Sequence, residues 1–66
     1  MACELWLSGC DYMLYVAAEH KEVMNGINRY RDWKVAASYQ NGALQYRVPR
    51  SDYAKARRIE KRINAT

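Results

Sequence analysis

Residues 34–48, KVAASYQNGALQYRV, decide the fold of this chain. Apolar and polar residues alternate on both sides of Asn41-Gly42, a pair that favours the two-residue type I′ turn of a β-hairpin. Alternation of this kind predicts a hairpin with one buried and one solvent-facing side. Because a two-residue turn fixes the register, the apolar face is predicted to hold three cross-strand pairs: Val35 with Val48, Ala37 with Tyr46, and Tyr39 with Leu44. The polar face is predicted to hold Lys34, Ala36, Ser38, Gln40, Ala43, Gln45 and Arg47.

The residues after the hairpin predict a short amphipathic helix with a basic outer face. Pro49 ends the second strand because it has no N–H to donate to a sheet. Ser51 is a suitable N-cap, and Asp52 places negative charge at the positive end of the helix dipole. One face, which we expect to pack on the apolar side of the hairpin, holds Asp52, Ala56, Ile59 and Ile63. The opposite arc holds Lys55, Arg57, Arg58, Lys61 and Arg62.

The first half of the chain admits two assignments. Residues 3–7 alternate and predict a short strand that ends at Ser8-Gly9. After them, residues at spacings of three and four indicate one face of a helix capped by Asp11: Met13, Val16, His20, Val23, Ile27 and Tyr30. Residues 12–18 are apolar on all sides, so the alternative is a buried second strand that pairs with the first across residues 8–10. We favour the helix, in which Asn25-Gly26 is either the C-terminal cap or an unfavourable internal pair.

Together these elements predict an α+β fold. It is a single compact β-α-β-β-α domain over residues 1–66, with an antiparallel sheet and helices packed on one face. The chain has no Phe and eight Trp or Tyr residues, so large side chains with polar tips must build the core. A domain of this size buries only about 60% of its unfolded surface. Association would add to that burial, and residues 12–18 are a candidate interface for a homodimer.

Charge is distributed unevenly between the two halves. Residues 1–28 carry one lysine and four acidic residues, for a net charge of −3. Residues 29–66 carry ten Lys or Arg and three acidic residues, for a net charge of +7. A basic half of this kind predicts an anionic partner, either nucleic acid (DNA or RNA) or an acidic protein surface.

Three groups of residues are candidates for that contact. The first is the basic arc of the C-terminal helix, where arginine forks suit phosphate and guanine best: Arg57, Arg58 and Arg62, with Lys55 and Lys61. The second is the polar hairpin face, with Lys34, Gln45 and Arg47. The third is the basic-aromatic cluster Arg29, Tyr30 and Arg31, in which Tyr30 is the candidate for stacking on a base. The order Trp33, strand, turn, strand, helix is similar in outline to the sheet-plus-helix DNA-binding domains of tyrosine-recombinase arms and AP2-type factors.

Sequence features that would indicate catalysis, a metal or a cofactor are missing from this pattern. Cys3 and Cys10 lie seven apart without a CxxC motif, and we expect two reduced thiols rather than a zinc site. His20 is the only histidine and has no partnered nucleophile, so we expect neither an enzyme nor a cofactor or small-molecule substrate. No signal peptide or membrane-spanning run is recognisable, which predicts a cytoplasmic protein.

These features favour a small non-enzymatic regulatory protein. We expect it to bind nucleic acid through the basic C-terminal helix and the polar hairpin face. The alternative is a small phage-type inhibitor or adaptor that docks on a larger host protein or enzyme complex, with its tyrosines and arginines as interface anchors.

Overall fold

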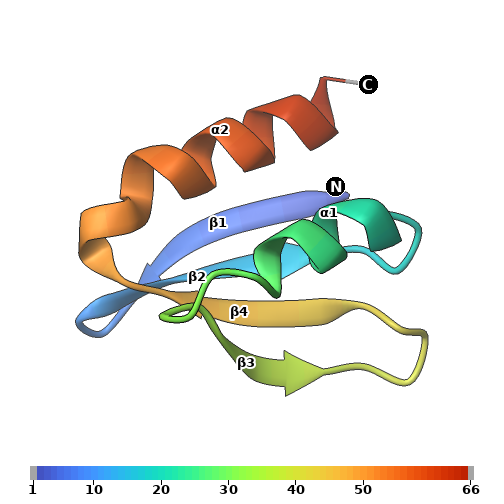
Figure 1. Cartoon of the computed structure of the whole chain (residues 1–66), viewed down its shortest axis with the longest axis horizontal. Coiled ribbons are helices and arrows are strands. Elements are labelled where there is room, and N and C mark those ends of the chain that lie inside the picture. Colours follow the sequence, from blue (N-terminus) through green and yellow to red (C-terminus); the bar gives the residue numbers. More distant parts are fainter. Residues whose placement is uncertain (1, 66) are drawn as a thin grey trace.

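A computed structural model describes residues 2–65 and contains one four-stranded antiparallel sheet and two helices (Figure 1). The strands lie side by side in the order β1-β2-β4-β3. In chain order the elements are β1 (Cys3–Ser8), β2 (Asp11–Val16), α1 (Lys21–Ile27), β3 (Lys34–Ser38), β4 (Leu44–Val48), a 3₁₀ turn (Arg50–Asp52) and α2 (Tyr53–Asn64). The chain is therefore a small α+β domain, but its order is β-β-α-β-β-α rather than the predicted β-α-β-β-α.

The difference arises at residues 11–16, which form strand β2 and not the start of a helix. The preferred helix assignment and the cap at Asp11 were wrong, and the alternative of a second strand is what the structure contains. β2 pairs with β1 across Gly9-Cys10, where Gly9 supplies the positive φ of +63° that the two-residue turn requires. The helix begins only at Lys21, and Gly26 lies inside it.

The second hairpin forms, but its turn and register differ from the prediction. The N–H of Tyr39 donates to the carbonyl of Ala43 over 3.0 Å, which encloses a loop of three residues, 40–42. Asn41 does not adopt positive φ; its side-chain oxygen accepts from the N–H of Ala43 over 3.0 Å, and Gly42 alone has positive φ at +96°. The longer loop and a bulge at residue 36 pair Ser38 with Leu44, Ala37 with Gln45, Val35 with Tyr46 and Lys34 with Arg47.

The two glycines 26 and 42 predict opposite responses to the same substitution. Gly42→Ala forces a Cβ into the left-handed region, with Ala18 Cβ 3.4 Å away, and should lower the free energy of unfolding by about 1–2 kcal/mol. Gly26→Ala adds a Cβ with no atom within 4 Å inside a helix and should raise it by about 0.5–1 kcal/mol. Urea unfolding followed by circular dichroism measures both changes. Equal losses of unfolding free energy in the two variants would contradict the conformation of the loop over residues 40–42.

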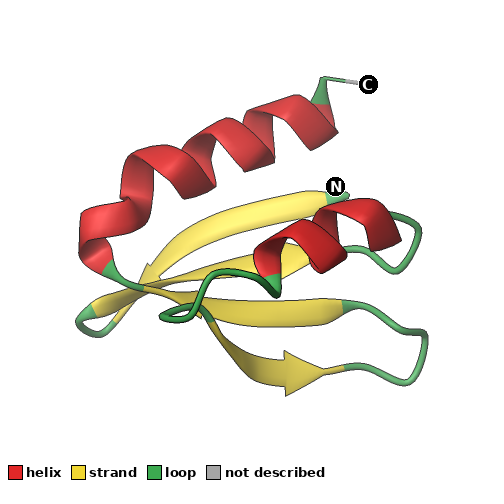
Figure 2. Cartoon of the chain, in the orientation of Figure 1, coloured by secondary structure: helices red, strands yellow, loops and turns green. Residues whose placement is uncertain are grey.

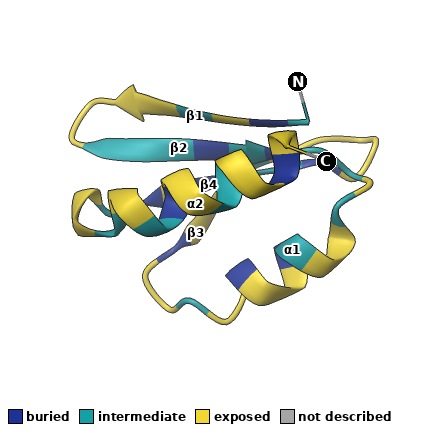
Figure 3. Cartoon of the chain, turned by 90° about the horizontal axis from the view of Figure 1, so that it is seen from above, coloured by how far each residue is buried: buried dark blue, intermediate teal, exposed yellow. Residues whose placement is uncertain are grey.

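Both helices contribute to one core on one face of the sheet (Figures 2 and 3). The buried side chains of that face are Cys3 from β1, Leu14 and Val16 from β2, and Tyr46 and Val48 from β4. The helices add Met24 and Ile27 from α1 and Ala56 and Ile63 from α2, and Trp33 closes one side. The predicted burial of Ala56 and Ile63 is confirmed, although α2 packs chiefly against β1 and not against the second hairpin.

The start of α2 is fixed by a contact that differs from the predicted cap. Ser51 lies in the 3₁₀ turn and does not cap the helix. Asp52 instead accepts a hydrogen bond of 2.9 Å from the indole Nε1 of Trp33. This bond joins the segment before β3 to the residue that precedes α2, so it sets where the helix leaves the sheet.

Two side chains of α2 cover part of the exposed edge of β1. Glu60 accepts from the backbone N–H of Leu5 over 3.2 Å. Asn64 donates its side-chain N–H to the carbonyl of Cys3 over 2.9 Å. An uncovered edge strand is a template for pairing with another chain, so these bonds protect β1 from such pairing. They also hold α2 alongside β1.

Candidate functional site

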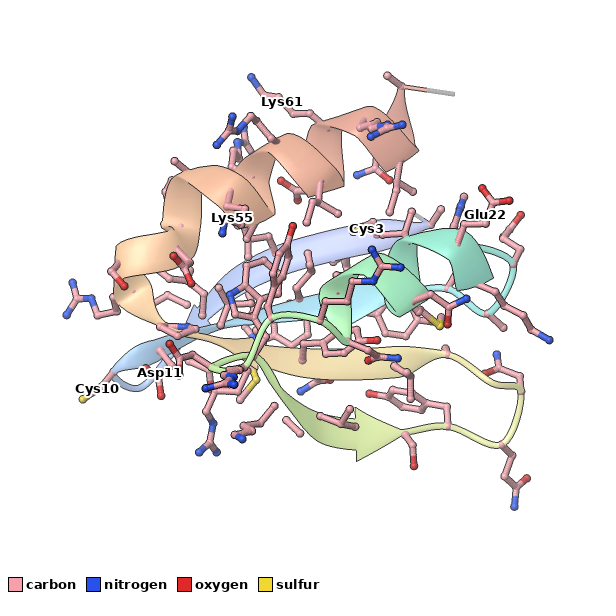
Figure 4. The ribbon with its side chains drawn as sticks, viewed as in Figure 1. Cys3, Cys10, Asp11, Glu22, Lys55 and Lys61 are labelled. Atoms are coloured by element: carbon pink, nitrogen blue, oxygen red, sulfur yellow. The ribbon has the colours of Figure 1, made fainter. Side chains whose placement is uncertain are left out.

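The basic arc of α2 divides into two groups that face different parts of the molecule. Lys55, Arg58 and Arg62 follow one another at helical spacings of three and four and form what we call the groove-side row. Arg57 and Lys61 lie on the other flank, next to the residues that bond to β1, and we call them the edge-side pair. Figure 4 shows Lys55 toward the rest of the molecule and Lys61 on the far side of the helix.

Arg62, at one end of the groove-side row, lines a shallow groove of about 350 Å³ between α1 and α2. Its floor is apolar and includes Val23 and Ile27 of α1 with Ile59 of α2. Glu22 and Arg62 line the same groove from opposite helices. The groove therefore combines an apolar floor with a rim that is more basic on the α2 side.

The structure brings the third predicted group, the cluster around Tyr30, against this row. The Nζ atom of Lys55 lies 4.5 Å from the centroid of the Tyr30 ring, close enough for a cation–π interaction. The other contact of Tyr30 is Trp33, with ring centroids 4.9 Å apart. Arg29 and Arg31 flank Tyr30 in the chain and are exposed. Tyr30 therefore packs between its loop and α2, and Arg29 and Arg31 add two exposed cations next to it in the chain.

Few cations of this surface are neutralised inside the molecule. Among residues 2–65, Arg57 forms an ion pair with Glu60 at 2.7 Å, and Arg47 forms one with Asp11 at 4.0 Å. Arg58, Lys61 and Arg62 are exposed and take part in neither pair. α2 alone carries five Lys or Arg and one Glu, a net charge of +4 that equals the net charge of the whole chain. The rest of the protein is therefore neutral in sum, and the positive charge is concentrated on this helix.

The second predicted group, the polar hairpin residues, lies on the opposite side of the sheet. The side not covered by helices, which we call the open face, carries Lys34, Gln45 and Arg47 in cross-strand register with β2. The amide oxygen of Gln45 accepts from the Tyr39 hydroxyl over 2.9 Å, so this amide is already engaged. The structure thus separates the polar hairpin residues from α2 and brings the Tyr30 cluster to α2 instead.

The open face also holds four large side chains that were not predicted there. Trp6, Met13, Tyr15 and Tyr39 lie on it, with Trp6 38% and Tyr39 45% exposed. Tyr39 was expected on the apolar side, but the longer loop turns it to the open face, where its ring contacts that of Tyr15 at 5.6 Å. The sequence signal for this surface was that consecutive residues are both apolar, as in Trp6-Leu7 and Met13-Leu14. In a strand, consecutive side chains point to opposite faces, so both faces carry large apolar side chains.

Both cysteines are free thiols, in different environments. Cys3 is fully buried, and burial, with the charges of Glu60 and Glu4, raises the pKa of its thiol to about 12. Cys10 is exposed at the tip of the β1–β2 turn (Figure 4). Within residues 2–65 no three His, Cys, Asp or Glu side chains are grouped so that they could hold a metal ion. Neither described helix is long and apolar enough to cross a membrane.

Comparison with models of protein families, with curated proteins and with solved structures gives no match to this chain. Function is therefore inferred from the geometry and charge of the surfaces described above.

Proposed function

We propose that this chain is a small non-enzymatic regulatory protein that binds nucleic acid through α2 and the adjoining Tyr30 loop. The observation that supports this proposal is the groove-side row, in which Arg58 and Arg62 are exposed and take part in neither of the ion pairs described within residues 2–65. Lys55 joins them on the same line, held in place over the Tyr30 ring.

The geometry suits a phosphate backbone better than a set of base edges. The row spans about 10 Å along the helix, from the rise of 1.5 Å per residue. Its long, charged side chains stand on a rigid helix, and Arg29 and Arg31 add two exposed cations from the loop. Contacts of this kind release counterions from the nucleic acid, so binding should be strong at low salt and should weaken steeply as salt rises.

The proposal is tested by two double variants that remove the same charge from the same helix. Arg58→Ala/Arg62→Ala removes two cations from the groove-side row, and Arg57→Ala/Lys61→Ala removes the edge-side pair. Fluorescence anisotropy with labelled duplex and single-stranded oligonucleotides is measured at several salt concentrations. We expect the first variant to lose affinity at least about tenfold more than the second, and its slope of log K against log salt to fall by about two.

The possible outcomes discriminate between this proposal and its alternatives. Absence of binding at low salt for the wild-type chain would overturn it. Equal losses in the two double variants would assign the binding to net charge and not to the groove-side row. The inhibitor or adaptor would be favoured by two results together. Neither double variant would change oligonucleotide binding, and Arg58→Ala/Arg62→Ala would abolish a salt-sensitive complex with an acidic protein.

A further inference from the structure

The open face of the sheet has no role in the proposed nucleic-acid contact, and neither helix covers it (Figures 1 and 3). Its side chains form two cross-strand rows. One row runs Trp6, Met13, Arg47, Lys34 from β1 to β3, and the next runs Glu4, Tyr15, Gln45, Ala37. Asp11 lies on the same face of β2, two residues before Met13, and is paired with Ser8 of β1.

Charge on this face is divided between its two halves. The acidic residues, Glu4 and Asp11, lie on β1 and β2. The basic residues, Arg47 and Lys34, lie on β4 and β3. Arg47 and Asp11 approach each other across this face at 4.0 Å, and both side chains are exposed. The face is therefore neutral in sum but polarised from one edge of the sheet to the other.

We propose that the open face binds a second copy of this chain, face to face, about a twofold axis parallel to the strands. Such a rotation lays β1 of one copy over β3 of the other, and β2 over β4, because the sheet order is β1-β2-β4-β3. The acidic half of each copy then meets the basic half of the other. Trp6 lies opposite Lys34 of the second copy, with Glu4 one row away, and Asp11 lies diagonal to Arg47.

The same observations disfavour a nucleic acid as the occupant. Two carboxylates offset the two cations on this face, which leaves little attraction for phosphate. Trp, Tyr, Met and Arg are the residue types enriched at the cores of protein interfaces, and this face carries all four. A small domain whose core holds few large side chains also gains stability from covering such a surface.

The size of the face sets the expected strength. Four strands about 4.8 Å apart, each about six residues long, give a face about 20 Å on each side, or about 400 Å² per copy in projection. This is at the low end for specific interfaces, so we expect a dissociation constant in the micromolar range. The helices lie on the outer sides of such a dimer and leave α2 free, so dimer formation and oligonucleotide binding are separately testable.

The test reverses charges at the two ends of the face. Sedimentation velocity over a range from about 1 μM to about 1 mM measures the association of the wild-type chain and its variants. Glu4→Lys alone and Lys34→Glu alone each place like charges one row apart across the axis, and each should weaken association about tenfold or more. The double variant Glu4→Lys/Lys34→Glu restores opposite charges across the axis and should recover most of the loss. Glu19→Lys and Lys61→Glu make the same charge changes at exposed positions outside the face and should leave association unchanged.

All of these positions are exposed, so the variants should fold, which circular dichroism checks. A wild-type chain that stays monomeric over the whole range would overturn the proposal. If the single charge reversals leave the association constant unchanged, or if the double reversal does not restore it, the proposed arrangement is overturned. If the chain stays monomeric and Trp6→Ala abolishes its binding to single-stranded oligonucleotide, the open face is a nucleic-acid surface and not a dimer interface.

Discussion

Replacing Tyr46 with alanine should cost about 3–5 kcal/mol of the free energy of unfolding, the range seen when a large buried side chain is removed from a core. Tyr46 is fully buried in the middle of β4, between Leu14 of β2 and Val35 of β3. Its hydroxyl donates to the side-chain oxygen of Asn28, the residue that ends α1, over 3.2 Å. One side chain therefore fills the core and joins it to the end of a helix. Domains of this size have only about 3–10 kcal/mol of stability, so the variant should be largely unfolded near room temperature.

Tyr39 provides the matched control for this substitution. It is the same residue type in the same hairpin, and the two-residue turn would have placed it on the face of Tyr46. In the structure it is 45% exposed and contacts Tyr15 and Gln45 on the open face. Tyr39→Ala should therefore cost less than about 1 kcal/mol.

Urea unfolding of the two variants tests the register of the hairpin as well as the core. Tyr46→Phe keeps the ring and removes only a hydrogen bond, at a cost of about 0.5–1.5 kcal/mol, so it remains measurable if Tyr46→Ala does not fold. Similar losses for Tyr39→Ala and Tyr46→Ala would mean that both rings are buried. That result would favour the two-residue turn over the three-residue loop.

The hairpin shows how far local sequence reasoning reaches. Asn41-Gly42 predicted a reversal at the right place, and the burial of Tyr46 and Val48 follows from alternation along β4. The register was wrong because Asn41 uses its side chain to bind the N–H of Ala43 and leaves positive φ to Gly42 alone. One additional loop residue turned Tyr39 to the other face. The choice between the two loops depends on a single side-chain hydrogen bond, which the alternation of apolar and polar residues cannot predict.

The assignment of residues 11–16 failed for a different reason. β2 is a central strand, with Leu14 and Val16 in the core and Met13 and Tyr15 on the open face. Because both faces of the strand carry apolar side chains, the alternation that marks a half-exposed strand is absent. The spacing of Met13 and Val16 then matched a helix by coincidence. The aromatic and β-branched residues of this segment favoured the strand, and they were the better guide.

The candidate site was predictable in composition but not in arrangement. The basic residues of α2 follow from the sequence, since a helix with buried Ala56 and Ile63 must turn its cations outward. The link between the Tyr30 loop and α2 is a contact between Lys55 and Tyr30, which are 25 positions apart in the chain. The aromatic open face depends on β2, so it could not be recognised while that segment was assigned to a helix.

The second large effect is expected at alkaline pH and comes from the buried thiol of Cys3. Its pKa is raised from 9.0 to about 12, first because the site excludes water and then because Glu60 and Glu4 oppose a second negative charge. In the unfolded chain the thiol titrates near its ordinary value. Below about pH 9 the thiol is protonated in both states and stability does not depend on it.

Between pH 9 and 12 the unfolded chain releases this proton and the folded chain keeps it. The folded state therefore binds more protons, and the free energy of unfolding falls as pH rises, by about 1.4 kcal/mol per pH unit for one proton. Tyr46 acts in the same direction above pH 10, because burial raises its pKa as well. Urea unfolding at a series of pH values measures the combined slope.

Cys3→Ala separates the two contributions. It removes the thiol proton, so the slope between pH 9 and 12 should become shallower, by up to about 1.4 kcal/mol per pH unit, even if the variant is less stable at neutral pH. Glu60→Gln removes one of the charges that raise the pKa of Cys3 and should shift the start of the thiolate reaction with iodoacetamide to lower pH. Cys10→Ala removes the exposed thiol of the β1–β2 turn without touching the core, and we expect it to keep the wild-type slope. If Cys3→Ala keeps that slope as well, the alkaline loss of stability does not originate at Cys3, and the buried position of its thiol against α2 would be contradicted.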